Sequence, residues 1–210
     1  MSSINKTIPL YLKVIFTAFM AVLVPFYWRT YGPSNFLYFC DVALLLTLFG
    51  IWTEDKLLIS LPAVGILIPQ FIWVVDFVAG LFGFAALGMT DYMFDSNIPL
   101  FARGLSLFHG WLPFLLIYLV YKVGYDKRAF RYWTVTAWVL ISICYFIMPA
   151  PGVILENINA PVNINYVFGF SDVVAQTWMH PHLYFASLMI GLPLFVYYPT
   201  SRILMRLSCD

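Results

Sequence analysis

Long apolar stretches, separated by short polar segments, are the dominant pattern along the chain. A helix that crosses a membrane needs about 20 mainly apolar residues, because each residue adds about 1.5 Å along the helix axis. By this criterion the sequence predicts six membrane-spanning helices, at residues 9–27, 36–52, 57–78, 98–122, 130–148 and 179–198. Short connections and the lack of an internal repeat favour one compact unit. We therefore predict an all-α, polytopic membrane helix bundle that forms a single domain over residues 1–210.

The composition agrees with a membrane protein. Hydrophobic residues make up 62% of the 210 residues and charged residues 10%, whereas an ordinary soluble domain has roughly 25% charged residues. The net charge of +1 gives no reason to expect nucleic acid as a partner, so membrane lipid is the partner that the composition indicates. The cysteines are odd in number and far apart, which favours free thiols over a disulfide framework; they are Cys40, Cys144 and Cys209.

The basic residues predict the orientation, because Lys and Arg are retained on the cytoplasmic side of a membrane. With six spans, both termini lie on one side. That side would carry eight basic residues, namely Lys6, Lys56, Lys122, Lys127, Arg128, Arg131, Arg202 and Arg206. The opposite, far side would carry Arg29, with Arg103 just inside a span. We therefore predict cytoplasmic termini, two long far-side connections at residues 79–97 and 149–178, and, for a bacterial protein, residence in the plasma (inner) membrane.

Ionisable residues inside the predicted spans gather in the half of the membrane next to the far side. On the helical rise, Asp41 and Arg103 lie roughly 7 Å deep and His109 roughly 16 Å deep, while Asp76 ends the third span. Such residues normally face the bundle interior and have a partner. One interpretation is a polar pocket open to the far side, with Arg103 and Asp76 contacting a substrate. The alternative is an interhelical ion pair between Asp41 and Arg103, with His109 donating to a backbone carbonyl.

His109 suggests acid–base chemistry in the first of these interpretations. A histidine beside a hydroxyl or thiol can activate a nucleophile when a carboxylate orients its ring. Ser106 lies three residues earlier on the same helix, and Cys40 and Tyr38 are the other nucleophile candidates, with Tyr38 also a substrate contact. Asp41 is the candidate for orienting the ring. This hypothesis requires a carboxylate, from Asp41 or Asp76, within direct or one-water reach of His109.

A metal site is a weaker interpretation of the histidines. His180 and His182 flank Pro181, a spacing that matches neither a helical i,i+4 pair nor a standard zinc signature. We predict that both lie at the membrane interface, and we predict neither a metal nor another cofactor. The loop before them, from Ala150 to Trp178, is rich in Pro, Asn and Gly yet carries many apolar residues. We expect it to fold back as a lid, with Asn163 or Asn165 donating hydrogen bonds to a substrate.

Three motifs together resemble a known group of membrane proteins. They are "YGPSNFLYFCDVALL", "SLFHGWLPFLLIYLVYK" and "NINYVFG", in that order. In order and spacing they resemble the androgen-induced-gene-like hydrolases of fatty acid esters of hydroxy fatty acids, and a bacterial multi-pass group similar to a eukaryotic phospholipid acyltransferase. The resemblance implies a catalytic Thr near the Asp of the second span and a catalytic His before a Leu-Pro pair. His109 matches the latter, one residue closer to the proline, whereas the Thr position falls on Tyr38, with Cys40 two residues later.

These observations leave three functions open. The first is a protein that binds, hydrolyses or transfers the acyl chain of a lipid in a far-side polar pocket. The second is a proton-linked transporter in which Asp41 and His109 relay charge, although the paired repeats usual in transporters are not seen. The third is a non-catalytic membrane subunit.

Overall fold

The structure is a computed structural model, and it describes residues 7–84 and 87–208. The described residues form a helical bundle. Its longer elements are α1 (Leu10–Thr30), α2 (Phe39–Thr53), α3 (Lys56–Leu81), α4 (Leu100–Ser106), α5 (Phe108–Val123), α6 (Ala129–Phe146), α7 (Pro181–Gly191) and α8 (Tyr198–Leu207). Shorter helical turns are η1 (Pro33–Leu37), η2 (Asp91–Met93), η3 (Ile164–Tyr166) and the π-helical segment η4 (Leu192–Tyr197). The all-α prediction is confirmed.

Five helices of the described chain are long and apolar enough to cross a membrane. They are α1, α3, α6, the α4–α5 unit over Leu100–Val123, and the α7–α8 unit over Pro181–Leu207. The remaining predicted span corresponds to α2, a mainly apolar helix of 15 residues, which is only about 22 Å long. That is short against the roughly 30 Å hydrocarbon core of a bilayer. The structure thus supports a multi-pass membrane protein, with five of the six predicted spans of full length.

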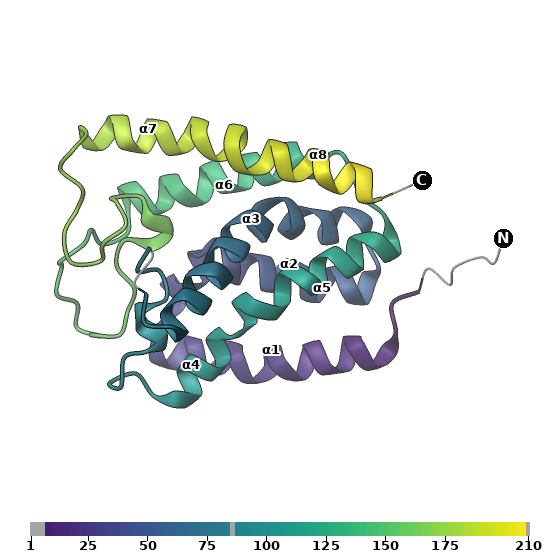
Figure 1. The fold of residues 1–210 in the computed structure, drawn as a ribbon, viewed down its shortest axis with the longest axis horizontal. Helices are drawn as coiled ribbons and strands as arrows, with labels where there is room; N and C mark the ends of the chain where they lie inside the picture. The colour runs from purple at the N-terminus through teal and green to yellow at the C-terminus, as the bar shows by residue number, and fades with distance from the viewer. Residues whose placement is uncertain (1–6, 85–86, 209–210) are drawn as a thin grey trace.

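Successive long helices run in alternating directions. Figure 1 shows the first residues of α1 and the last residues of α8 at one end of the bundle, with the connections 87–99 and 147–180 at the other end. We call the latter the loop end. Up-and-down order of this kind follows from short turns between the other helices, such as Glu54–Asp55 between α2 and α3.

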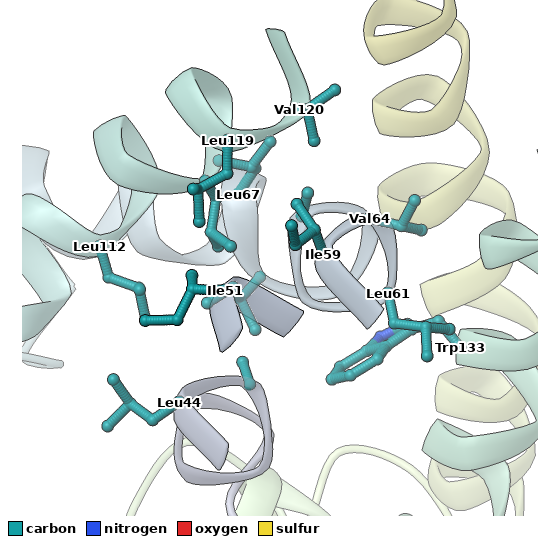
Figure 2. Close-up of a cluster of buried hydrophobic side chains, with 14 of the residues drawn as sticks. Leu44, Ile51, Ile59, Leu61, Val64, Leu67, Leu112, Leu119, Val120 and Trp133 are labelled. Atoms are coloured by element: carbon teal, nitrogen blue, oxygen red, sulfur yellow. The ribbon is translucent and has the colours of Figure 1, made fainter. Parts of the chain in front are cut away.

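The core of the bundle is apolar and is built around α3. The members labelled in Figure 2 belong to α2, α3, α5 and α6, and they are Leu44, Ile51, Ile59, Leu61, Val64, Leu67, Leu112, Leu119, Val120 and Trp133. Trp133 of α6 is fully buried and lies against Gly65 of α3. A β-carbon at Gly65 would overlap ring atoms of Trp133, so the absence of a side chain there allows α6 to approach α3.

The fourth predicted span is divided into two helices at Leu107. The amide of Gly110 donates to the Leu107 carbonyl at 2.9 Å, three residues back, instead of continuing the four-residue pattern. Pro113 lies just beyond and has no N–H to donate to the carbonyl four residues earlier. The result is a helix break at the depth where the sequence places Ser106 and His109.

The last predicted span is extended beyond residue 198. Helix α7 continues through η4 into α8, so the helical segment ends at Leu207. Pro193 and Pro199 lie within it, and the π-helical turn accommodates the interruption of the backbone hydrogen bonds. The apolar criterion ended the span early, because α8 carries Arg202 and Arg206.

Candidate functional site

Asp41 is a buried carboxylate in the first turn of α2, near the loop end. Only 3% of the Asp41 surface is exposed. The Oδ2 atom accepts a hydrogen bond from Asn35 Nδ2 at 3.1 Å. The Oδ1 atom is buried and has no hydrogen-bond partner. A buried carboxylate oxygen without a partner is costly, although the positive end of the α2 dipole offsets part of the cost.

The Tyr27 hydroxyl lies near Asp41 and is paired with a second hydroxyl, that of Ser106. Tyr27 of α1 and Ser106 of α4 face each other, with 3.3 Å between their hydroxyl oxygens. The Ser106 hydroxyl also donates to the backbone carbonyl of Ala102 at 3.2 Å. Tyr27 is close enough to Asp41 and to Cys40 to interact with both electrostatically. Tyr27 therefore connects the carboxylate on α2 with the hydroxyl on α4.

An aromatic pair completes this group of polar side chains. The Tyr92 hydroxyl, on η2, lies near the hydroxyl of Ser106 and the indole of Trp73 on α3. The buried indole N–H of Trp73 is close to this hydroxyl but is not aligned to form a hydrogen bond with it, so it has no partner in the described structure. Burial raises the pKa of Tyr92, so its hydroxyl stays protonated at neutral pH. We call the set Tyr27, Asn35, Asp41, Trp73, Tyr92 and Ser106 the polar cluster.

Unpartnered polar atoms concentrate in and next to the polar cluster. Within residues 7–84 and 87–208, the buried side-chain atoms without a hydrogen-bond partner are Asp41 Oδ1, Trp73 Nε1, Gln70 Oε1 and Nε2, Arg103 Nε, Trp133 Nε1 and Tyr197 OH. Gln70 lies one helical turn from Trp73, and Arg103 one turn from Ser106. Trp133 and Tyr197 form a separate pair, with ring centroids 6.4 Å apart. The cluster thus holds one unpartnered oxygen, Asp41 Oδ1, and one unpartnered N–H, that of Trp73, while Arg103 Nε and the Gln70 amide lie on the same helices as cluster members.

His109 has a structural hydrogen bond. Its Nδ1 is 2.9 Å from the backbone carbonyl of Ser106, the carbonyl that the break at Leu107 leaves without its usual amide donor. A carbonyl can only accept, so Nδ1 carries the proton and Nε2 is the ring atom left for chemistry. The ring stacks on Trp73, with centroids 5.1 Å apart, and contacts Phe108. The described contacts of His109 include neither Asp41 nor Asp76, so the predicted His–carboxylate pair is not seen.

Arg103 and Asp76 each hold the connection between α3 and α4. Arg103 Nη1 donates to the Met93 carbonyl at 3.1 Å, so its described bond is to the loop and the interhelical pair with Asp41 is not formed. Asp76 accepts from the amide of Leu87 at 2.7 Å and from the amide and hydroxyl of Thr90 at 3.0 and 2.9 Å. These three bonds make Asp76 an anchor for the loop.

Asn163 and Asn165 organise the long loop and its contact with α2. Asn163 Nδ2 donates to the carbonyls of Gly169 and Ser171, within the loop. Asn165 Oδ1 accepts from the amide of Phe39, the first residue of α2, at 3.0 Å, and its Nδ2 donates to Leu37 at 2.9 Å. Asn165 therefore caps α2 from 126 residues away. The side-chain amides of Asn163 and Asn165 therefore donate to backbone carbonyls of the protein, whereas the sequence predicts donation to a substrate.

The loop end also holds Tyr38, Tyr166 and Asp172 close together. Burial raises the pKa of Tyr166 to about 12, and the nearby Asp172 carboxylate acts in the same direction. The Tyr166 phenol therefore stays protonated at neutral pH. Cys40 Sγ lies 4.0 Å from Asp41 Oδ2, a distance typical of a weak thiol contact.

The remaining histidines and cysteines form no metal site in the described part of the chain. No group of three or more potential ligands occurs among residues 7–84 and 87–208. His182 Nδ1 lies 2.9 Å from the Tyr145 hydroxyl, and the His180 and His182 rings are in contact. Cys40 and Cys144 are free thiols, as predicted, and Cys209 lies outside the described residues.

Four cluster members were not predicted as functional: Tyr27, Asn35, Trp73 and Tyr92. Tyrosine and tryptophan near the end of a span are also what an interfacial aromatic belt produces, so their types carried no distinct signal. Gln70, next to the cluster, did carry such a signal, because an amide in the middle of an apolar span is expensive to bury.

No protein-family model matches the chain, and no curated protein and no solved structure matches it either.

Proposed function

We propose that the protein is an integral membrane protein with six spans, in which α2 and the preceding turn η1 make a short sixth crossing. The eight-to-one division of basic residues supports cytoplasmic termini, as does the position of the ends of α1 and α8 at the same end of the bundle (Figure 1). A C-terminal green fluorescent protein fusion should fluoresce in a bacterial host, while an alkaline phosphatase fusion at the same position should be inactive. The reverse pattern would reject this topology.

We further propose that the polar cluster binds the polar head of an acyl lipid in the far half of the bilayer. The observation that carries the proposal is the buried, unpartnered Oδ1 of Asp41. An acceptor of this kind calls for a hydroxyl donor from a ligand. The free N–H groups of Trp73 and Arg103 call for oxygen acceptors, such as those of an ester or an acid. A lipid that carries both a hydroxyl and an ester oxygen would satisfy all three atoms.

The surroundings of the cluster suit an acyl tail. Leu100 and Phe101, on α4, are exposed on the outer surface of the bundle. Phe101 also makes an edge-to-face contact with Phe26 of α1, with ring centroids 5.0 Å apart. Apolar side chains therefore lead from the lipid-facing surface towards the helices that carry Tyr27 and Ser106. The motif resemblance to hydrolases of fatty acid esters supports the same class of ligand.

Binding is favoured over hydrolysis by the contacts of Ser106 and His109. The Ser106 hydroxyl interacts with Tyr27 and Ala102, whereas His109 bonds to the Ser106 backbone carbonyl. A base must reach the hydroxyl that it deprotonates, whereas the His109 imidazole contacts the backbone carbonyl oxygen of Ser106 and not its hydroxyl. A transporter is disfavoured because Ile59 and Leu67 of the apolar core lie on α3 between its first residue, Lys56, and Trp73 of the polar cluster.

Photocrosslinking tests the proposal. Purified protein would be labelled with a diazirine monoacylglycerol, which carries hydroxyls and an ester, or with the matching methyl ester, which lacks the hydroxyls. We expect preferential labelling by the monoacylglycerol on α1, α2 or α4. Because a typical hydrogen bond contributes about 0.5–1.5 kcal/mol, Asp41→Ala should weaken labelling by roughly two- to tenfold. Asp95→Ala is the matched control, since Asp95 is exposed and bonds only to nearby Asn97 in the described structure.

Two results would reject lipid binding at this site. One is equal labelling by the two lipids. The other is equal labelling of wild type and Asp41→Ala, with both proteins shown to be folded by their thermal unfolding. Treatment with a fluorophosphonate, beside a measurement of monoacylglycerol turnover, examines catalysis separately. Turnover lost in His109→Gln but kept in Asp95→Ala would show that the protein is a hydrolase as well.

A further inference from the structure

A shallow groove runs along the outer face of the C-terminal helix. It has a volume of about 490 Å³ and is lined by Leu194, Phe195, Tyr198, Pro199, Arg202, Ile203 and Arg206. All of these residues come from η4 and α8. The lining changes along the helix axis, from apolar and aromatic residues at the η4 end to two arginines near the C-terminal end. The groove is distant in sequence from the polar cluster and shares no residue with it.

The inner face of α8 is fixed to the bundle, which determines where the arginines lie. Ser201 and Leu204 are buried. The Tyr125 hydroxyl donates to Ser201 Oγ at 2.7 Å, and the Tyr125 amide donates to Ser208 Oγ at 2.9 Å. Two hydrogen bonds, 7 residues apart on α8, therefore hold the helix against the connection between α5 and α6. Arg202 and Arg206, one turn apart, are exposed on the opposite face.

We propose that this groove binds a phospholipid with an anionic head group. Its two guanidinium groups match a phosphate in charge and in hydrogen-bond geometry. The order of the lining residues matches the order of a lipid's parts in a leaflet, because the acyl chain would lie along Leu194 and Phe195 and the phosphate would lie at the arginines, nearer to water. Tyr198 lies between the two regions, at the level where aromatic residues meet head groups.

Native mass spectrometry of the purified full chain tests the proposal. The protein would be exposed to equal amounts of phosphatidylmethanol, which is anionic and has no head-group hydroxyl that the polar cluster could recognise, and phosphatidylcholine with the same acyl chains. Wild type should retain phosphatidylmethanol preferentially. The double variant Arg202→Gln/Arg206→Gln should lose roughly 30-fold in relative affinity for phosphatidylmethanol, given the contribution of each basic side chain near a membrane surface.

The matched control is Lys127→Gln/Arg131→Gln, which removes the same charge from exposed positions at the same end of the bundle. We expect this control, and Asp41→Ala, to keep the preference, so that failure here is distinguishable from failure of lipid binding at the polar cluster. The proposal is overturned by any of three results: no preference in wild type, an equal loss in the two double variants, or full displacement of the lipid by glycerol 3-phosphate at matched ionic strength. The last result would mean that the groove binds an anion and no acyl chain.

Discussion

Replacement of Gly65 by alanine tests the close packing of α3 against α6. A β-carbon at Gly65 would overlap Cε2, Cζ2 and Nε1 of Trp133. Trp133 is fully buried and also contacts Phe39 and Tyr197, so its ring has no free space to enter. Relief of the overlap requires either a strained side-chain rotamer or separation of the two helices.

The expected loss follows from two opposing effects. Alanine is better than glycine in a helix interior by about 1 kcal/mol. Overpacking in a dense core costs about 1–3 kcal/mol and in some cases more, and the overlap with three ring atoms places Gly65→Ala at the upper end. We expect a net loss of about 2 kcal/mol, which corresponds to a fall of roughly 4–8 °C in the unfolding temperature.

Thermal unfolding in detergent can be followed with a thiol-reactive fluorogenic dye. Cys144 is fully buried, so its reaction with the dye reports the loss of structure, and a Cys209→Ser background removes the C-terminal thiol. Gly104→Ala is the control, because a β-carbon on that helical glycine would meet nothing within 4 Å; its unfolding temperature should stay level or rise. In the Gly65→Ala background, Trp133→Phe should recover part of the loss. The packing argument fails if Gly65→Ala behaves like Gly104→Ala.

Three further predictions concern the loop end. Asn165→Ala removes the acceptor for the Phe39 amide and should lower stability by about 1–2 kcal/mol. Asn157→Ala should have little effect in the same thermal assay, because the two bonds of the Asn157 side chain, to the Thr30 carbonyl and the Asn159 amide, are exposed. Asp76→Ala should increase the rate of limited proteolysis within residues 87–99, with Glu156→Ala, an exposed carboxylate on the other connection, as the control. Burial raises the pKa of the Asp172 carboxyl in the folded protein. Protonation of Asp172 therefore stabilises the folded loop. This stabilisation is complete below the unfolded-state pKa of about 3.9 and is lost as the pH rises through the raised pKa of the folded protein. The loop should therefore resist proteolysis better at pH 5 than at pH 7.5, and Asp172→Asn should remove this difference.

The helices could largely be predicted from the sequence, because the apolar stretches specify where a chain can cross a membrane. The predicted fifth span, 130–148, corresponds to α6 at Ala129–Phe146. The apolar criterion failed where the chain stays helical but becomes amphipathic, as after Tyr198, where buried Ser201 and Leu204 alternate with exposed arginines. The predicted second span, 36–52, began three residues before α2, since Phe36, Leu37 and Tyr38 are also apolar or aromatic.

The candidate site was predicted only in part. Depth alone places Asp41 and Ser106 in the loop half of the bundle. The partner of each polar group, in contrast, depends on the path of the connections, which apolar periodicity does not specify. Arg103 illustrates this dependence, because the course of the chain after η2 brings the Met93 carbonyl to its guanidinium, and the Asp41 carboxylate has Asn35 of η1 instead.

The helix break at Leu107 explains why a serine and a histidine three residues apart do not form a catalytic pair. In an unbroken helix, Ser106 and His109 would lie on one face, and the Ser106 carbonyl would accept from the Gly110 amide. The break turns the Gly110 amide to Leu107 and leaves the Ser106 carbonyl free. Nδ1 of His109 then satisfies that carbonyl, so the ring stacks on Trp73 of α3 while the Ser106 hydroxyl faces Tyr27 of α1. The same break that gives the histidine a structural hydrogen bond thus separates its ring from the Ser106 hydroxyl. Of the two residues, Asp41 rather than His109 is the one with a buried atom that has no partner in the described structure.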